Sequence, residues 1–359
     1  MTTTSKSSVK VPESFYSPRD FTYIKPMRRR LTEYEAVICN AQPDMNQFDT
    51  GGWFLLRPDL RASFDSASTA LRHPNWFDYR DPSGLWQRPY IKLQAQHERS
   101  ISQASEAAVL NGSLKDIQPP WVELLAPYYE AFASLEWGMF RAHAFVAREA
   151  LSDTLTMAFT FSGMDRLRHQ QDIALYSLEL HDQIGSYQEG LGMDAWLGDE
   201  VWQPTRRLVE RLLTLTDWVE IVAMTNLVID PMVTAFIGSE FFRALAPLHG
   251  DVVTPVIEMT AEADRIRNLN ATRELARMVT AEADRAGESV PAQHNRETLQ
   301  AWTDSWYPMA VEAVDAFEGV FHRLPAGTQR AGQAKASVAA NTRDILEQVG
   351  LQVPVEVRA

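Results

Sequence analysis

The stretch SDTLTMAFTFSGMDRLRHQQDIALYSLELHDQIGSY, residues 152–187, decides the fold class of this sequence. Ser152 or Asp153 can cap the start of a helix, because a short polar side chain there accepts a hydrogen bond from a free backbone N–H. Residues then recur at the spacing of one helix face, at Leu155, Phe159, Ser162, Arg166, His169 and Ile173. The pattern predicts one long helix, and long helices usually pack into bundles.

The segments on either side also have helical patterns. Arg88-Pro89 opens a run that Gly112 closes, since proline is tolerated in the first turn of a helix and glycine favours its end. Further runs are expected over residues 119–151, 201–215, 217–246, 252–286, 291–322 and 326–350. No alternating strand pattern follows residue 66, so the sequence predicts an all-α protein.

The first 66 residues differ in character from the rest. They carry scattered aromatic residues, a Gly51-Gly52 pair and prolines at 12, 18, 26, 43 and 58. We interpret residues 1–66 as an extended N-terminal arm, disordered at 1–10. A helical domain is expected over 67–350, followed by a C-terminal tail at 351–359.

Composition narrows the functional classes. The 359 residues include 47 Asp+Glu and 34 Lys+Arg, and the net charge of −13 argues against nucleic-acid binding. Cys39 is the single cysteine, which excludes an intramolecular disulfide or a Cys-rich metal site and fits a reducing cytoplasm. No apolar stretch reaches the ~20 residues of a membrane span, and the first residues lack the apolar core of a signal peptide. We therefore expect a cytoplasmic protein.

Helical bundles often carry their chemistry in a carboxylate-bridged two-metal site, which takes a Glu from each of two helices and a Glu-x-x-His from each of two others. None of the eight histidines has an acidic residue three positions before it. Two runs nevertheless match each other, Asp165–His169 (DRLRH) and Asp264–Asn268 (DRIRN), which start 99 positions apart (264 minus 165). They are either an internal repeat or two Arg-rich faces in solvent.

Three stretches resemble the small (β) subunit of the hydroxylases of soluble di-iron multicomponent monooxygenases. They are Tyr34–Trp53 (YEAVICNAQPDMNQFDTGGW), Trp76–Pro82 (WFDYRDP) and Trp86–Tyr90 (WQRPY). The resemblance covers roughly residues 20–325 and is nearest to the propane and small-alkane type. It implies a ferritin-like (ribonucleotide-reductase-like) helical bundle.

The same resemblance implies a degenerate metal site. Catalytic large subunits of the family read D-E-x-R-H, in which Glu and His bind iron. Here the Glu positions hold Arg166 and Arg265, the His positions hold His169 and Asn268, and the lone carboxylates correspond to Glu136 and Glu220.

Arginine in these positions is incompatible with iron ligation. Guanidinium has only donors and a permanent positive charge, so it cannot bind a metal ion. We expect no metal and no catalytic residue in this chain, with Arg166 and Arg265 pairing with Glu136 and Glu220 inside the bundle. The alternative is that both arginines form ordinary surface salt bridges.

The family also implies partners and cofactors for the complex. Two catalytic large (α) subunits and two small subunits would form a heterotetramer, sometimes with a third subunit. The di-iron centre would lie in the large subunit, with NADH, flavin and iron–sulfur in a separate reductase and control by a coupling protein. The substrate would be propane or a similar small hydrocarbon or a phenol, and this chain would scaffold the catalytic subunit.

The residues expected to contact the large subunit are aromatic or basic and lie mostly on the arm. They are Tyr23, Arg28, Arg29, Arg30, Tyr34, Phe48, Trp53, Trp76 and Trp86. For the basic cluster, a solvated surface patch is the alternative. Two other functional classes stay open: a catalytic di-metal oxidase with unusual ligands, and a non-enzymatic helical scaffold.

Overall fold

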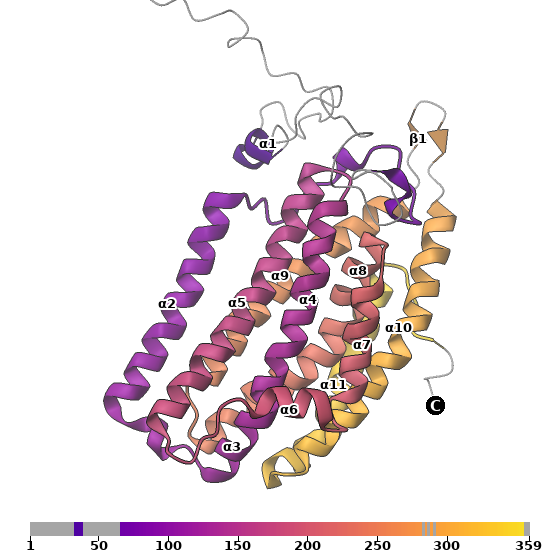
Figure 1. Cartoon of the computed structure of the whole chain (residues 1–359). Helices are drawn as coiled ribbons and strands as arrows, with labels where there is room; N and C mark the ends of the chain where they lie inside the picture. Colours follow the sequence, from indigo (N-terminus) through magenta and orange to yellow (C-terminus); the bar gives the residue numbers. More distant parts are fainter. Residues whose placement is uncertain (1–31, 39–64, 282–283, 286–287, 290–291, 355–359) are drawn as a thin grey trace, which may run out of the picture.

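The computed structural model describes residues 32–38, 65–281, 284–285, 288–289 and 292–354. These residues form an all-α bundle, as the sequence predicted (Figure 1). The α-helices are α1 (Glu33–Ile38), α2 (Gln87–Asn111), α3 (Pro119–Leu124), α4 (Glu130–Glu149), α5 (Asp153–Gln183), α6 (Leu191–Gly198), α7 (Gln203–Thr214), α8 (Trp218–Met224), α9 (Thr254–Thr280), α10 (Ala292–Phe321) and α11 (Pro325–Gln348). Two π-helical segments, Leu125–Tyr129 and η7 (Thr225–Arg243), follow α3 and α8 directly.

Four helices make the centre of the bundle. α4 packs along α5, η7 packs along α9, and the two pairs meet where α5 contacts α9. α2 lies against the outside of α5 and α9, while α6 and α7 cover α4, and α10 and α11 cover η7. Figure 1 shows α2, α5 and α4 running beside one another along the bundle. The middle turns of α4, α5, η7 and α9 therefore face one another around a common interior.

Local sequence explains where several helices begin and end. The Ser152 hydroxyl caps α5 by accepting a hydrogen bond from the backbone N–H of Leu155 at 3.3 Å. The Asp217 carboxylate accepts two backbone N–H groups from the first turn of α8, at 2.9 and 3.1 Å. Gly112 takes a φ of 78° after α2, a conformation that glycine adopts without strain. The predicted start of α5 and the predicted end of α2 are confirmed.

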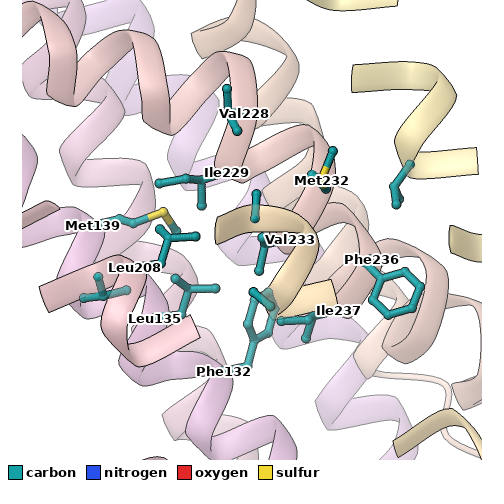
Figure 2. Packing of buried hydrophobic residues seen from close by; sticks show 14 of the residues in the cluster. Phe132, Leu135, Met139, Leu208, Val228, Ile229, Met232, Val233, Phe236 and Ile237 are labelled. Carbon is teal, nitrogen blue, oxygen red and sulfur yellow. The ribbon is translucent and has the colours of Figure 1, made fainter. Parts of the chain in front are cut away.

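η7 is buried along nearly its whole length. It is π-helical over 19 residues, although π-helical geometry elsewhere occurs mostly as single-turn bulges. The segment Trp218–His249 is long and apolar enough to cross a membrane, but 94% of its most apolar window is buried within the bundle, as in a core helix. Figure 2 shows how its side chains pack against those of α4 and α7. The residues labelled there are Phe132, Leu135, Met139, Leu208, Val228, Ile229, Met232, Val233, Phe236 and Ile237.

The structure departs from the sequence predictions at two places, in the arm and after α9. Within the predicted extended arm, residues 33–38 form helix α1, whose Glu35 carboxylate accepts the Thr32 backbone N–H at 3.0 Å. The first long helix, α2, starts at Gln87, one residue before the predicted opening at Arg88-Pro89, and residues 65–86 before it hold two short 3₁₀ turns. A pair of two-residue strands, β1 (Asp284–Arg285) and β2 (Glu288–Ser289), lies in a region where no strand was expected.

Candidate functional site

Six ionisable side chains meet at the centre of the bundle, and we call them the central charge cluster. They come from all four central helices and none is more than 8% exposed. The members are Glu136 on α4, Arg166 and His169 on α5, Asp230 on η7, and Glu258 and Arg265 on α9. Since buried charge is costly unless it is paired, the pairing within the cluster decides what the site can do.

Arg166 joins two of the helices that flank α5. Its Nη1 lies 3.4 Å from Glu136 Oε2, and its Nη2 donates to the carboxylate of Asp230. The same Nη2 lies 3.5 Å from the side-chain oxygen of Asn226. The guanidinium thus lies between an acid of α4 and an acid of η7.

His169 lies between Glu136 and the third carboxylate of the cluster, Glu258. Its Nδ1 lies 3.1 Å from Glu136 Oε1 and its Nε2 lies 2.9 Å from Glu258 Oε1. Burial would lower the pKa of this imidazole, but the two carboxylates outweigh burial and raise its pKa to about 9. His169 is therefore a cation at pH 7, with Nε2 hydrogen-bonded to Glu258 and Nδ1 in an ion pair with Glu136.

The two glutamates are correspondingly held in their ionised form. Burial favours a protonated Glu136, but Arg166 and His169 prevail and lower its pKa to about 2. Glu258 also has a lowered pKa, since His169 and Arg265 outweigh its burial. The Tyr129 hydroxyl donates a further hydrogen bond to Glu258 Oε1 at 2.9 Å. Both carboxylates are thus anions with buried donors around them.

Arg265 completes the charge balance. Its Nη2 lies 3.8 Å from Glu258 Oε2. Glu258 has room beside it because η7 carries Gly238 there: a Cβ on Gly238 would lie 2.4 Å from Glu258 Oε2. At pH 7 the cluster then holds three cations and three carboxylates, with no net charge.

A second charged layer lies between the central charge cluster and α2, and it is built from the two matching runs. Asp165 pairs with Arg267, and Asp264 pairs with Arg168 at 2.9 Å, so each run supplies an acid to the arginine of the other. Gln94 of α2 donates to Asp165 at 3.1 Å and to Asp264 at 3.0 Å. The two runs thus pair with each other inside the bundle. The alternative, two Arg-rich faces in solvent, is wrong.

The donor set of the central charge cluster does not fit a di-iron centre. A ligand must offer a lone pair, whereas the N–H groups of Arg166 point at the very carboxylates that could bind a metal. Bringing a cation to those carboxylates would also place it against a permanent positive charge. Within the described part of the chain, no group of three or more His, Cys, Asp or Glu side chains could hold a metal ion.

Comparison with known proteins identifies the family. The model of the family described as Methane/Phenol/Alkene Hydroxylase matches residues 53–283. The chain belongs to this hydroxylase family. It is 29% identical over 346 residues to the propane 2-monooxygenase hydroxylase small subunit of Rhodococcus jostii (strain RHA1), covering 94% of this chain and 91% of that relative. It is 30% identical over 324 residues to the methane monooxygenase component A beta chain of Methylococcus capsulatus (Bath), covering 88% and 82%.

Solved hydroxylase structures share the fold. A structure of phenol hydroxylase from Pseudomonas sp. OX1 superposes with a TM-score of 0.70 at 21% identity, over 92% of this chain and 97% of that one. A toluene 4-monooxygenase hydroxylase structure gives 0.63 at 23% identity, over 70% and 80%. The predicted resemblance to hydroxylase small subunits and the predicted bundle fold are confirmed.

The structure brings together most of the site residues expected from the sequence. Glu136, Arg166, His169 and Arg265 lie in the central charge cluster. Asn268 lies beside it and donates to Asp165 at 3.0 Å. Because both arginines are at least 92% buried, the alternative of surface salt bridges is wrong.

Glu220 is the exception, and its predicted pairing with an arginine inside the bundle is wrong. It lies half-buried on α8 and accepts a hydrogen bond from Trp306 Nε1 at 2.8 Å. η7 instead supplies Asp230, ten residues further along (230 minus 220). The carboxylate nearest to Arg265 is Glu258, on the same helix.

Sequence reasoning missed Asp230, Glu258 and Tyr129. Spacing could have found Glu258, since seven residues separate it from Arg265 (265 minus 258) and such residues share one face of a helix. Asp230 could have been found from its spacing to the arginine of the next helix. It stands 35 positions before Arg265 (265 minus 230), close to the 30 positions between Glu136 and Arg166 (166 minus 136). Tyr129 carried no comparable signal.

Two of the expected interface residues turn out to be internal. Tyr34 is 7% exposed and its hydroxyl accepts the backbone N–H of Asp81 at 3.1 Å. Trp76 is 8% exposed and packs edge-on against Trp218, with ring centroids 5.6 Å apart. Both rings therefore pack within the chain. Trp86 is half-buried. Tyr23, Arg28, Arg29, Arg30, Phe48 and Trp53 lie outside the described residues.

Proposed function

We propose that this chain is the non-catalytic small subunit of the hydroxylase component of a multicomponent monooxygenase. The observation that carries the proposal is Arg166, whose guanidinium occupies the space between Glu136 and Asp230. The cluster supplies its own cations, so it can hold four helices together without a metal ion. The chain would do no redox chemistry itself and would scaffold the catalytic large subunit.

The names of the relatives suggest the reaction of the whole complex. They are subunits of propane 2-monooxygenase and of methane monooxygenase, which supports the O₂-dependent hydroxylation of propane or a similar small hydrocarbon. The di-iron centre would lie in the large subunit, and electrons from NADH would come through a separate flavin and iron–sulfur reductase. A heterotetramer of two large and two small subunits in the cytoplasm, with a coupling protein, fits this role.

Iron analysis of separated subunits tests the proposal. The chain is co-expressed with a large hydroxylase subunit from the same organism, the complex is purified, and iron is measured by mass spectrometry in the complex and in each chain purified alone. We expect about two irons per large subunit and none above background in this chain. About two irons in this chain would overturn the non-catalytic assignment, and failure to recover a complex would overturn the subunit assignment.

A further inference from the structure

A hollow of about 90 Å³ lies where α9 and α11 pack against η7. It reaches the central charge cluster, because Asp230 of η7 and Arg265 of α9 both line it. The exposed residues Ile266 and Asn341 line it as well, so the hollow opens at the surface. That volume is room for about three waters, or for one small organic molecule whose bonded atoms lie closer together than waters do.

Two side chains that line the hollow carry buried polar atoms without a hydrogen-bond partner among the described residues. Both are more than nine-tenths buried. Neither Nη1 nor Nη2 of Arg265 has an acceptor in the described part of the chain, and Glu258, 3.8 Å away, is beyond hydrogen-bond distance. Asp230 accepts from Arg166 with Oδ2, while its Oδ1 has no donor among these residues. Buried polar atoms almost always have partners, so these atoms indicate that something else binds in the hollow.

The missing partner has to accept a hydrogen bond on one side and donate one on the other. The guanidinium of Arg265 has donors and no acceptor, whereas the carboxylate oxygen of Asp230 is an acceptor. A hydroxyl group serves both, because its oxygen accepts while its O–H donates. The unpartnered atoms therefore predict a ligand that carries a hydroxyl group.

The charges around the hollow favour a neutral ligand. The three cations of the central charge cluster already balance its three carboxylates. Glu262, which also lines the hollow, is paired with Arg243. A bound cation would meet Arg265, and a bound anion would meet Asp230 and Glu262. Either ion would bring an uncompensated charge next to buried groups, which is costly.

Most of the remaining wall of the hollow is apolar. The side chains that form it come from all three helices, and they are Pro231, Ala235, Ile266, Leu269 and Ile345. A short hydrocarbon chain covers such a wall better than water does, because removing apolar surface from water is favourable. The hollow thus combines a polar floor with an apolar wall.

We propose that this hollow binds a short-chain alcohol, with its hydroxyl group between Asp230 and Arg265 and its hydrocarbon chain against the apolar wall. The O–H donates to Asp230 Oδ1, and the oxygen accepts from a guanidinium N–H of Arg265. Hydroxylation of a small hydrocarbon yields a molecule of this class. Because binding is measured on this chain alone, it can fail without affecting the proposed function.

The test compares two isomers, 1-butanol and diethyl ether, on the full-length chain purified alone. The ether oxygen can only accept a hydrogen bond, so it leaves Asp230 Oδ1 without a donor. Binding is measured by titration with ligand-observed saturation-transfer NMR, and butylammonium at the same concentrations tests the preference for a neutral ligand. For so small a molecule as 1-butanol we expect a Kd on the order of 1 mM.

We expect 1-butanol to bind saturably, and diethyl ether and butylammonium to bind at least about tenfold more weakly. Equal binding of the ether would overturn the role of Asp230 and Arg265. Tighter binding of butylammonium would overturn the preference for a neutral ligand. If none of the three molecules binds saturably, the hollow holds water alone and the inference fails.

A matched pair of variants locates the binding. Ala235→Leu fills the hollow from η7, and Ala339→Leu makes the same change at a half-buried alanine of α11 outside it. Circular dichroism checks that both variants fold. We expect Ala235→Leu to weaken binding of 1-butanol at least about tenfold and Ala339→Leu to leave it unchanged. Unchanged affinity of a folded Ala235→Leu variant would overturn the inference, and if that variant does not fold, the comparison of the two isomers on wild type decides.

Discussion

Removing the charge of Arg166 should destabilise the chain strongly. Arg166→Met keeps a long apolar stem but leaves two cations facing three carboxylates in the central charge cluster. The Arg166 side chain is 2% exposed, and Glu136 and Asp230 are 0% and 6% exposed, so water cannot replace the lost partner. Breaking a buried pair in this way costs about 3–5 kcal/mol, because an uncompensated charge is left in the interior.

A second substitution separates charge balance from lost contacts. Asp230→Asn in the Arg166→Met chain removes one carboxylate, keeps the side-chain shape and returns the cluster to neutrality. We expect the double variant to regain part of the lost stability, with a coupling of about 1–3 kcal/mol between the two sites. A surface control is Arg207→Met, whose partner Glu312 is 57% exposed and which should cost less than about 1 kcal/mol.

The assay is urea unfolding at pH 7.5, followed by far-UV circular dichroism on wild type and the four variants, including Asp230→Asn alone. A loss below about 1 kcal/mol for Arg166→Met would refute the view that the cluster is tightly paired. Strict additivity of the two substitutions would refute the role of charge balance, since the effects would then come from separate contacts.

Two further predictions concern His169 and Gly238. The pKa of His169 is raised to about 9 because its carboxylate partners outweigh burial, so its contribution to stability is complete below about pH 6.5 and is lost as pH rises towards 9. Urea unfolding should therefore show that the free energy of unfolding of wild type falls by an amount on the order of 3 kcal/mol between these pH values. The His169→Gln variant should lack this fall. If the free energy of unfolding changed equally with pH in both proteins, a charged imidazole at His169 would be contradicted. Gly238→Ala should cost about 1–3 kcal/mol, because the added Cβ would lie 2.4 Å from Glu258 Oε2. The control is Gly332→Ala on α11, where nothing lies within 4 Å of the added Cβ. This control should raise the free energy of unfolding, because alanine favours a helix more than glycine does. An unchanged free energy of unfolding for Gly238→Ala would show that Glu258 is free to move.

The sequence predicts the bundle well because helix signals are local. The Ser152 cap, the closing Gly112 and the spacing of apolar residues in α5 act within a few turns, so each can be recognised without knowing the fold. The path of the segment before α2 could not be predicted in the same way. Residues 65–86 form loops whose hydrogen bonds reach distant parts of the chain, such as the Tyr79 hydroxyl to the carbonyl oxygen of Ala271 at 3.0 Å.

The acidic partners were harder to predict because they depend on how helices pass one another. Glu220 and Asp230 lie on the same continuous apolar run, and sequence alone does not say which of them faces α5. The π-helical winding of η7 shifts its faces away from the spacing of an α-helix. Asp230 therefore reaches Arg166, whereas Glu220 turns towards Trp306 on α10.

The central charge cluster combines fixed carboxylates with cations that belong to the chain itself. Three acids from three different helices converge on one buried interior, and such a group is stable only if equal positive charge lies among them. A metal ion would meet that need from outside and could be lost by exchange, whereas Arg166, Arg265 and His169 meet it permanently. His169, whose pKa is raised to about 9, loses its charge as the pH becomes alkaline. The cluster should accordingly hold the four helices in a fixed arrangement at neutral pH and loosen first, under alkaline conditions, where His169 joins α4 to α9.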